Sequence, residues 1–296
     1  MKRKILLLGA GGQLGKSISS LCGSGDILQS IQLIALSHAD LDVTSETNVM
    51  AAVKNINPDY VINAAAYTAV DAAEDNHETC YAINADAPKY IAKACNKCNA
   101  RMIHISTDYV YDGDIKIPHP EDETPSPIGV YATSKLMGEN YISENCDNAV
   151  VLRTSWLYSP FGKSFVKTIG KYSFSKSEIS VVADQCGNPT NALDLANAII
   201  DIILSEYWTP GIFNFSNAGI VSWYDFAIEI VSALGNADKC IIKPIESADY
   251  PAKAKRPNFS ALNCDKIREI YGIEQKNWRD SLNKFIIAYP DCFNND

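Results

Sequence analysis

The sequence predicts an α/β fold, in which a doubly wound parallel sheet is joined to a smaller second lobe. Short apolar runs alternate with helical patterns through the first half of the chain, as in a parallel sheet that helices cover on both faces. A glycine-rich turn follows the first apolar run. After Trp156 the alternation stops and Gly- and Pro-bearing loops interrupt short elements. The second lobe should therefore come mainly from residues after about 155.

The alternation defines five strands and four helices in order. The strands are expected at residues 4–8, 32–36, 60–63, 102–105 and 149–153. The helices are expected within residues 9–22 and over 45–56, 84–98 and 131–145. Right-handed crossovers between such strands give a doubly wound sheet, whose ligands bind at the carboxyl ends of the strands.

Composition excludes several classes of protein. The 296 residues are 47% hydrophobic and 21% charged, with a formal net charge of −9, which argues against nucleic acid or an anionic membrane as partner. No apolar run has the length of a membrane span, so we expect a soluble, cytoplasmic protein. The nine cysteines are scattered and odd in number, as expected for free thiols. Cys95 and Cys98 lack a second ligand pair, so no metal site is expected.

Gly9, Gly12 and Gly15 follow the first strand and open a helix. Glycines at this spacing allow a tight turn and close approach of a pyrophosphate to the helix N-terminus. The alternative is a glycine-rich connection that binds nothing. The position after the first strand favours a dinucleotide site.

The end of the second strand bears on the choice of dinucleotide. An acidic residue there typically bonds the ribose of NAD and repels the extra phosphate of NADP. Ser37 and His38 occupy this place, which favours NADPH but leaves NADH possible, since no arginine is present. Asp42 and Val43 follow at a place suited to the adenine side.

Tyr131 and Lys135 are four residues apart on a predicted helix and so share a face. The same spacing recurs in Tyr172 and Lys176, so spacing alone does not identify a site. Only the first pair follows a strand that ends in a hydroxyl residue, Thr107. The second pair is expected on a solvated helix or loop.

These three side chains suit ketone reduction. A ketone that takes up hydride develops negative charge on oxygen and needs a proton. The Tyr131 phenol would supply it, the Lys135 cation would lower the pKa of that phenol toward neutrality, and the Thr107 hydroxyl would hold the oxygen. The alternative is a polar helix face turned to water.

Motifs along nearly the whole chain resemble the dTDP-4-dehydrorhamnose reductase family of the extended short-chain dehydrogenase/reductase superfamily. The motifs are GAGGQLG, PDYVINAAAYTAVDAAE, ISTDYVYDG, YATSKLMGE, RTSWLY, DQCGNPT, SWYDFA and KRPNFSALN. The resemblance implies reduction of the C4 ketone of dTDP-4-dehydro-β-L-rhamnose to dTDP-L-rhamnose with NAD(P)H, the last step of dTDP-L-rhamnose synthesis. It also implies a Rossmann-type domain from residues 1–155 and roughly 180–207, with a discontinuous substrate lobe from roughly 156–179 and 208–296.

The resemblance adds residues to the site. It implies Thr107, Tyr131 and Lys135 as the catalytic residues. It implies a cofactor site that includes Gly12, Gln13, Leu14, Asp42, Val43, Ala66, Tyr67 and Thr68. Asp108 and Trp156 match positions that contact the sugar nucleotide, although Trp156 could instead be a core aromatic. Arg256 is a candidate for the diphosphate, with an ordinary surface arginine as the alternative.

One departure concerns metal. Some family members dimerise through magnesium held by glutamates, whereas Ser17 and Leu193 stand at the matching positions here. We therefore expect no magnesium, and a monomer or weak homodimer. Two other functions stay open: a different nucleotide-sugar ketoreductase or epimerase, and a non-catalytic subunit resembling the β-subunit of methionine adenosyltransferase.

Overall fold

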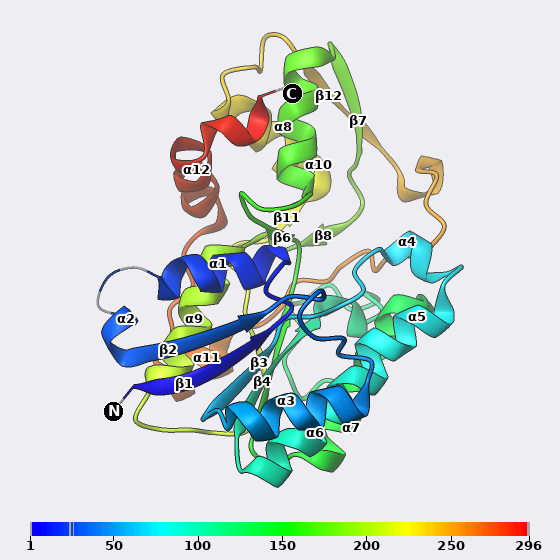
Figure 1. Cartoon of the computed structure of the whole chain (residues 1–296). Helices are drawn as coiled ribbons and strands as arrows, with labels where there is room; N and C mark the ends of the chain where they lie inside the picture. The colour runs from blue at the N-terminus through cyan, green and yellow to red at the C-terminus, as the bar shows by residue number, and fades with distance from the viewer. Residues whose placement is uncertain (1, 24, 26, 295–296) are drawn as a thin grey trace.

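A six-stranded parallel sheet forms the centre of the larger part of the molecule (Figure 1). The computed structural model describes residues 2–294 except 24 and 26. The strand order is β10-β5-β4-β3-β1-β2. The strands are β1 Arg3–Leu8, β2 Ile31–Leu36, β3 Tyr60–Asn63, β4 Arg101–Thr107, β5 Ala149–Thr154 and β10 Gly211–Asn214. The chain leaves β1 for β2 on one side and returns to β3 on the other, so a ligand crevice is expected at the carboxyl end of β1.

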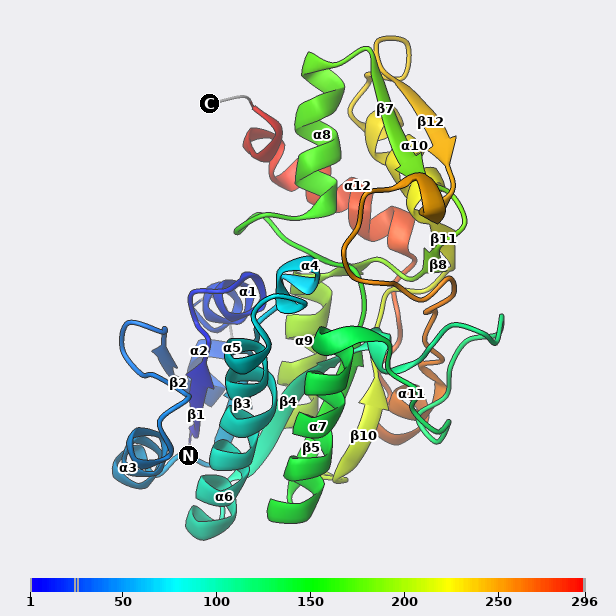
Figure 2. The same ribbon diagram turned by 90° about the vertical axis from the view of Figure 1, so that its right-hand side faces the viewer.

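Helices cover both faces of this sheet, and each face has its own apolar core. One face carries α1 Gln13–Cys22, α9 Ala192–Leu204 and α11 Asp265–Tyr271. The other carries α3 Glu46–Ile56, α6 Ala87–Cys98 and α7 Gly129–Asn145. The turned view in Figure 2 shows α6 and α7 side by side on their face. The predicted doubly wound fold is confirmed, because the strands are parallel and buried from both sides.

The smaller lobe lies beyond the carboxyl ends of the strands (Figures 1 and 2). Its own core joins a parallel strand pair to three helices. These elements are β7 Glu178–Val182, β12 Ile241–Ile245, α8 Phe165–Ser175, α10 Trp223–Ala233 and α12 Trp278–Ala288. Two short pairs lie between the lobe and the sheet: β6 Leu157–Tyr158 with β9 Thr190–Asn191, and β8 Cys186–Gly187 with β11 Val221–Ser222.

Short helical segments complete the chain. They are α2 Ile27–Ser30, α4 Val70–Ala73, α5 His77–Tyr81, the π-helix η1 Ala82–Asp86, and the 3-10 turns η2 Asp108–Val110, η3 Ser247–Asp249 and η4 Pro290–Phe293. The π-helix occupies the start of the helix expected at 84–98. Its tight packing on α7 requires Gly138, because a Cβ there would lie 2.2 Å from the carbonyl oxygen of Asn84.

The division between the two parts differs from the expected boundaries in three segments. β10 is hydrogen-bonded to β5 in the large sheet, and α11 packs against the core of that sheet, although residues 208–296 were expected in the substrate lobe. β7 pairs with β12 in the small lobe, although residues 180–207 were expected in the large one. The reason is that β10 completes the sheet edge beside β5, where its buried Phe213 packs with the α9 core.

Two further findings concern the described residues. None of their helices has the length and apolar character needed to cross a membrane. The nine cysteines are all free.

Candidate active site

A cavity of about 620 Å³ lies where the carboxyl ends of β1, β3, β4 and β5 face the small lobe. It brings together most of the residues predicted from the sequence. Of the predicted residues, it is lined by Gly12, Gln13, Leu14, Ala66, Thr68, Thr107, Asp108, Tyr131, Lys135 and Trp156. The others, Gly9, Gly15, Ser37, Asp42, Val43, Tyr67 and Arg256, lie outside its lining.

Gly9 and Gly15 shape the glycine turn. Gly9 has a φ of 79°, and a Cβ on it would lie 2.5 Å from the backbone nitrogen of Ala65. A Cβ on Gly15 would lie 2.3 Å from the carbonyl oxygen of Gly9. Only glycine fits either position. Gly12 caps α1 without a side-chain hydrogen bond, and the first residues of the helix, Gln13 and Leu14, line the cavity. Their uncapped amides suit a diphosphate. The turn therefore fits a dinucleotide.

The end of β2 carries an acidic group that sequence reasoning missed. Asp40 accepts hydrogen bonds from the backbone nitrogen (2.9 Å) and the hydroxyl (2.6 Å) of Ser37. These two hydrogen bonds, of which the one from the hydroxyl has the larger effect, lower the pKa of Asp40. Its carboxylate therefore stays charged at neutral pH. In the sequence, Asp40 stands three residues after Ser37, the position at which an acidic residue would be expected. Asp42 bonds Thr44 instead (2.7 Å to its hydroxyl), and Val43 is buried in the core.

The loop after β3 is held by Asn84, a second residue that sequence reasoning missed. Its side chain accepts from the backbone nitrogen of Tyr67 (2.9 Å) and donates to the carbonyl oxygen of the same residue (3.0 Å). It also donates to the hydroxyl of Ser134 on α7 (3.1 Å). Tyr67 thus contributes backbone anchorage, while its neighbours Ala66 and Thr68 face the cavity. A π-helix often marks a functional position, and Asn84 lies in one.

Thr107 is the last residue of β4 and lines the cavity beside Tyr131, whose pKa its hydroxyl lowers. Its hydroxyl donates to Asp108 Oδ1 (3.1 Å). The ring of Tyr109 lies edge-on to Tyr131, with centroids 6.1 Å apart. The expected convergence of a strand-end hydroxyl with the tyrosine is present.

The charge state expected for Tyr131 is not the one that the structure supports. Burial, the main cause, raises the pKa of Tyr131 above its ordinary value, and Thr107 opposes this only in part. The expectation that Lys135 lowers the phenol pKa toward neutrality is therefore wrong for the ligand-free protein. Lys135 is itself buried, and burial lowers its pKa to about 8. The phenol is thus protonated at neutral pH, the form that can donate a proton.

Asp108 is buried beside these hydroxyls. Burial raises its pKa to about 7, although the nearby hydroxyls of Ser260 and Thr107 act in the opposite direction. Its second oxygen, Oδ2, has no hydrogen-bond partner although it is buried, and the residue lines the cavity. A buried polar atom without a partner costs free energy, so a hydroxyl of a bound ligand would complete this site.

Trp156 adopts a left-handed backbone conformation, with a φ of 46°. Such a conformation costs about 1 kcal/mol for a residue with a side chain, and it tends to occur at functional positions. The indole stacks on Trp223 with ring centroids 3.5 Å apart. A Cβ on Gly187 would lie 2.8 Å from the Trp156 ring, so Gly187 leaves the room that the ring occupies.

Arg256 lies at a second cavity of about 440 Å³ in the small lobe. Trp223 lines both cavities, so the two adjoin. The Arg256 guanidinium donates to Asp71 Oδ2 of α4 (2.7 Å) and to the carbonyl oxygen of Ala254 (3.1 Å). It thereby joins the small lobe to the large one.

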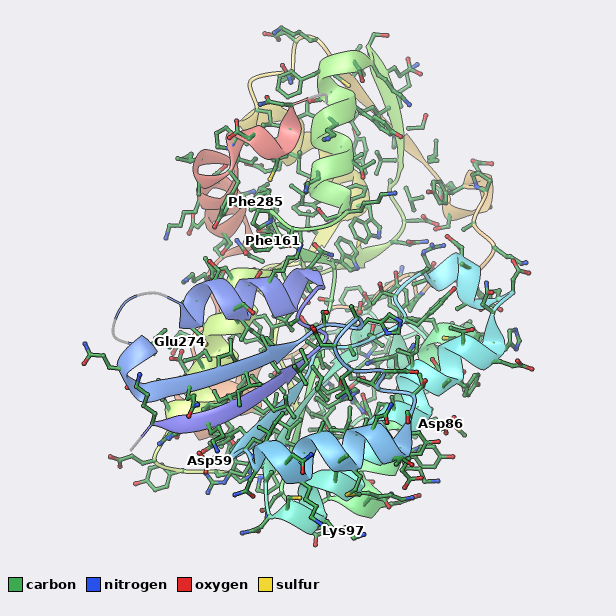
Figure 3. The ribbon with its side chains drawn as sticks, in the orientation of Figure 1. Asp59, Asp86, Lys97, Phe161, Glu274 and Phe285 are labelled. Atoms are coloured by element: carbon green, nitrogen blue, oxygen red, sulfur yellow. The ribbon has the colours of Figure 1, made fainter. Side chains whose placement is uncertain are left out.

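The second Tyr–Lys pair lies outside the main cavity and lines the second one. Tyr172 is exposed on α8, and the Lys176 nitrogen lies 4.0 Å from the centre of its ring. Nearer the cavity, Phe161 reaches the start of α1 (Figure 3), where Lys16 lies 5.8 Å from its ring centre. Ser159 in the same loop donates to Gln13 Oε1 (3.1 Å).

Ser17 and Leu193, which stand where some family members hold magnesium with glutamates, carry no carboxylate. Ser17 is buried and donates to the carbonyl oxygen of Gln13 (2.9 Å), and Leu193 is exposed on α9. Among the residues that the structure describes, no group of three or more His, Cys, Asp or Glu side chains could hold a metal ion.

Known proteins resemble the chain over its whole length. The family model for the RmlD substrate binding domain matches residues 3–290. A dTDP-4-dehydrorhamnose reductase of Aggregatibacter actinomycetemcomitans is 36% identical over 97% of this chain and 99% of its own.

Solved structures agree with this match. The crystal structure of a dTDP-4-dehydrorhamnose reductase from Clostridium acetobutylicum superposes with a TM-score of 0.92 at 36% identity, covering 97% of this chain and 99% of its own. One from Bacillus anthracis in complex with NADP has a TM-score of 0.89 at 34% identity, over 97% and 100%. The chain therefore belongs to the RmlD family, as its motifs predicted.

Proposed function

We propose that the protein reduces the C4 ketone of dTDP-4-dehydro-β-L-rhamnose to the alcohol with NADPH or NADH. The observation that carries the proposal is the position of Thr107, Tyr131 and Lys135 in one cavity with the glycine turn. NADPH would supply the hydride. The residues of this chain would bind the ketone and deliver the proton.

The chemistry follows from the protonation state of Tyr131 and from the position of Thr107 in the same cavity. The Tyr131 phenol is protonated, because burial raises its pKa, and the Thr107 hydroxyl lines the same cavity. A ketone oxygen placed against the two hydroxyls would receive that proton as negative charge develops on it. Asp108, whose Oδ2 lacks a partner, would bond a sugar hydroxyl.

The two adjoining cavities support a substrate with two parts. The sugar would occupy the cavity with Tyr131, and the nucleotide would extend past Trp223 into the second cavity, whose lining includes Phe165 and Arg256. A guanidinium matches the oxygens of a diphosphate. In the ligand-free structure Arg256 is paired with Asp71, so the diphosphate would compete for this pair or share it.

The cofactor is proposed from two opposing observations. The Bacillus anthracis relative was solved with NADP, in line with the preference expected from Ser37. The charged Asp40 at the end of β2 would repel a 2′-phosphate, which favours NADH. We propose NADPH as the cofactor and NADH as the alternative.

The test is oxidation of each reduced cofactor by the purified protein, with and without dTDP-4-dehydro-β-L-rhamnose. Substrate-dependent oxidation is expected, and Tyr131→Phe should lower its rate at least about 100-fold, the usual loss on removing a general acid. Tyr207→Phe is the matched control, because Tyr207 is 72% exposed.

Each other outcome points to a different function. An epimerase would retain NAD through purification and show no net oxidation. A non-catalytic subunit would bind the dinucleotide and leave the substrate unchanged. Oxidation that persists in Tyr131→Phe would remove Tyr131 from the mechanism.

A further inference from the structure

The helix that carries Tyr131 begins without a capping side chain of its own. α7 starts at Gly129, and its N-cap residue, Ile128, makes no side-chain hydrogen bond. Gly129 has a φ of 82°, a conformation that glycine adopts at little cost. The first amides of an α-helix have no acceptor within the helix and need partners from elsewhere. The first turn of α7, which includes Tyr131, therefore depends on groups from other parts of the chain.

Glu74 supplies one such acceptor, although it lies 56 residues before its partner in the sequence. Its Oε1 accepts a hydrogen bond from the backbone nitrogen of Val130 (2.9 Å). A Cβ on Gly129 would lie 2.8 Å from this oxygen, so the glycine leaves the space that the carboxylate uses. The partial positive charge at a helix N-terminus also favours a carboxylate. Glu74 thus caps α7 in place of a local side chain, one residue before Tyr131.

Glu74 is itself anchored from the side of the small lobe. It directly follows α4, and Asp71 of that helix accepts from the backbone nitrogens of Lys253 (3.1 Å) and Ala254 (3.0 Å). The same carboxylate accepts from the Arg256 guanidinium (2.7 Å). The carboxylate of Glu74 therefore reaches α7 from a short helix whose own position is fixed by three hydrogen bonds.

The other side of the first turn is held by Ser134 and Asn84. Ser134 Oγ donates to the carbonyl oxygen of Tyr131 (2.7 Å) and accepts from Asn84 Nδ2 (3.1 Å). Ser134 and Asn84 are both buried, so bulk water does not replace these bonds. Side chains thus fix the backbone of α7 just before Tyr131 and at Tyr131 itself.

We propose that Glu74 is a positioning residue, which sets the place of the Tyr131 phenol in the main cavity by capping α7. Glu74 lies outside the lining of that cavity, so it acts through the helix and not on the ketone. A misplacement of about 1 Å can lower the rate of a reaction about 100-fold, so a small shift of the first turn matters. The effect on turnover rests on the proposed function, whereas the effect on the place of Tyr131 does not.

The first test measures the cap without turnover. Hydrogen exchange followed by NMR reports how well the backbone amide of Val130 is protected. We expect this amide to exchange at least about threefold faster in Glu74→Ala, as the loss of a cap implies. Glu74→Gln should stay close to the wild type, because its side-chain oxygen still accepts. Glu78→Ala, at an exposed position of α5, is the matched control. Equal protection in Glu74→Ala and the wild type would overturn the proposal.

The second test follows the ring of Tyr131 in protein whose tyrosines are labelled with ¹³C. Tyr131→Phe identifies the ring signals by their loss. Because the ring lies edge-on to that of Tyr109, its signals depend on its place. We expect them to shift in Glu74→Ala and to stay unchanged in Glu78→Ala. Unchanged ring signals in Glu74→Ala would show that the cap does not place Tyr131, and would overturn the proposal.

The third test is the effect on turnover. In Glu74→Ala we expect kcat per folded molecule to fall at least about tenfold, while KM stays within about twofold. Glu74→Gln should restore most of kcat. A purely structural role would lower only the amount of folded protein, and an unchanged kcat per folded molecule would contradict the proposal. So would a Glu74→Gln variant as slow as Glu74→Ala.

Failure of this proposal can be distinguished from failure of the proposed function. If the wild type does not reduce the dTDP-sugar, the proposed substrate is wrong. The Val130 amide and the Tyr131 ring signals then still decide for or against Glu74, because neither measurement requires a substrate.

Discussion

The two walls of the main cavity are built differently. On the sheet side, Thr107 and Lys135 are buried, and each donates a hydrogen bond to a neighbouring group. The wall on the lobe side relies on the stacked Trp156 and Trp223, and on an Arg256–Asp71 pair that is partly exposed. The contrast indicates that the groups proposed for proton transfer are held in place before a ligand binds, whereas the groups proposed to bind the nucleotide can adjust.

The largest expected effect on folding lies behind the sheet-side wall. Glu139→Gln leaves the buried Arg153 without its charged partner, whose Oε2 lies 2.6 Å from Nη2. Breaking a buried pair costs on the order of 3–5 kcal/mol, measurable as the free energy of unfolding in urea. Glu178→Gln removes one side of the exposed Lys243 pair and should cost at most about 1 kcal/mol. Equal losses in both variants would show that burial does not distinguish the pairs.

A smaller effect is expected at Asp108, and it depends on pH. Its pKa is raised to about 7 in the folded protein, against about 3.9 in an unfolded chain. The folded state binds more protons between these values, so the wild type loses stability as pH rises from about 4 to about 7. Asp108→Asn removes this loss, which is on the order of 3–4 kcal/mol.

The measurement is unfolding of wild type and Asp108→Asn in urea from pH 4 to pH 8. The stability of the variant relative to the wild type should increase with pH and level off above about 7. Asp238→Asn, at an exposed position, should give a constant difference. A constant difference for Asp108→Asn would contradict the raised pKa.

The smallest effect on folding is expected on the lobe side. Asp71→Asn weakens the pair with Arg256, whose side chains are 45% and 19% exposed, so stability should change by less than about 1 kcal/mol. The freed guanidinium should instead change the KM for the sugar nucleotide several-fold, with kcat nearly constant. Asp75→Asn, in the exposed pair with Lys253, is the control. A large loss of stability in Asp71→Asn would show that this wall is as rigid as the other.

The sequence predicted the elements of the large sheet well, because their patterns are local. Fully apolar runs located the strands to within a few residues, and β4 extends as far as Thr107, the hydroxyl that the motif had identified. Local pattern could not assign β10, since its four residues gain their place only by pairing with β5. The roles of Asn84 and Asp40 depend on contacts across turns that no spacing rule describes.

The charge states were the least predictable part of the site. The Tyr131–Lys135 spacing predicted one helix face, which the structure has. It gave no information about the depth of burial, which decides the direction of both pKa shifts. Glu74 was not singled out, because Val130, whose backbone amide it accepts, lies 56 residues further along the chain.

The place of β10 and α11 in the large sheet has a consequence for how the chain folds during synthesis. When residues 1–155 have left the ribosome, β5 is an edge strand whose outer side lacks a partner, and unpaired edges invite association. Its partner and the covering helix follow only at Gly211–Asn214 and Asp265–Tyr271. The larger part cannot finish folding until most of the smaller one has been made, so the nascent chain should depend on chaperones until about residue 271 has emerged.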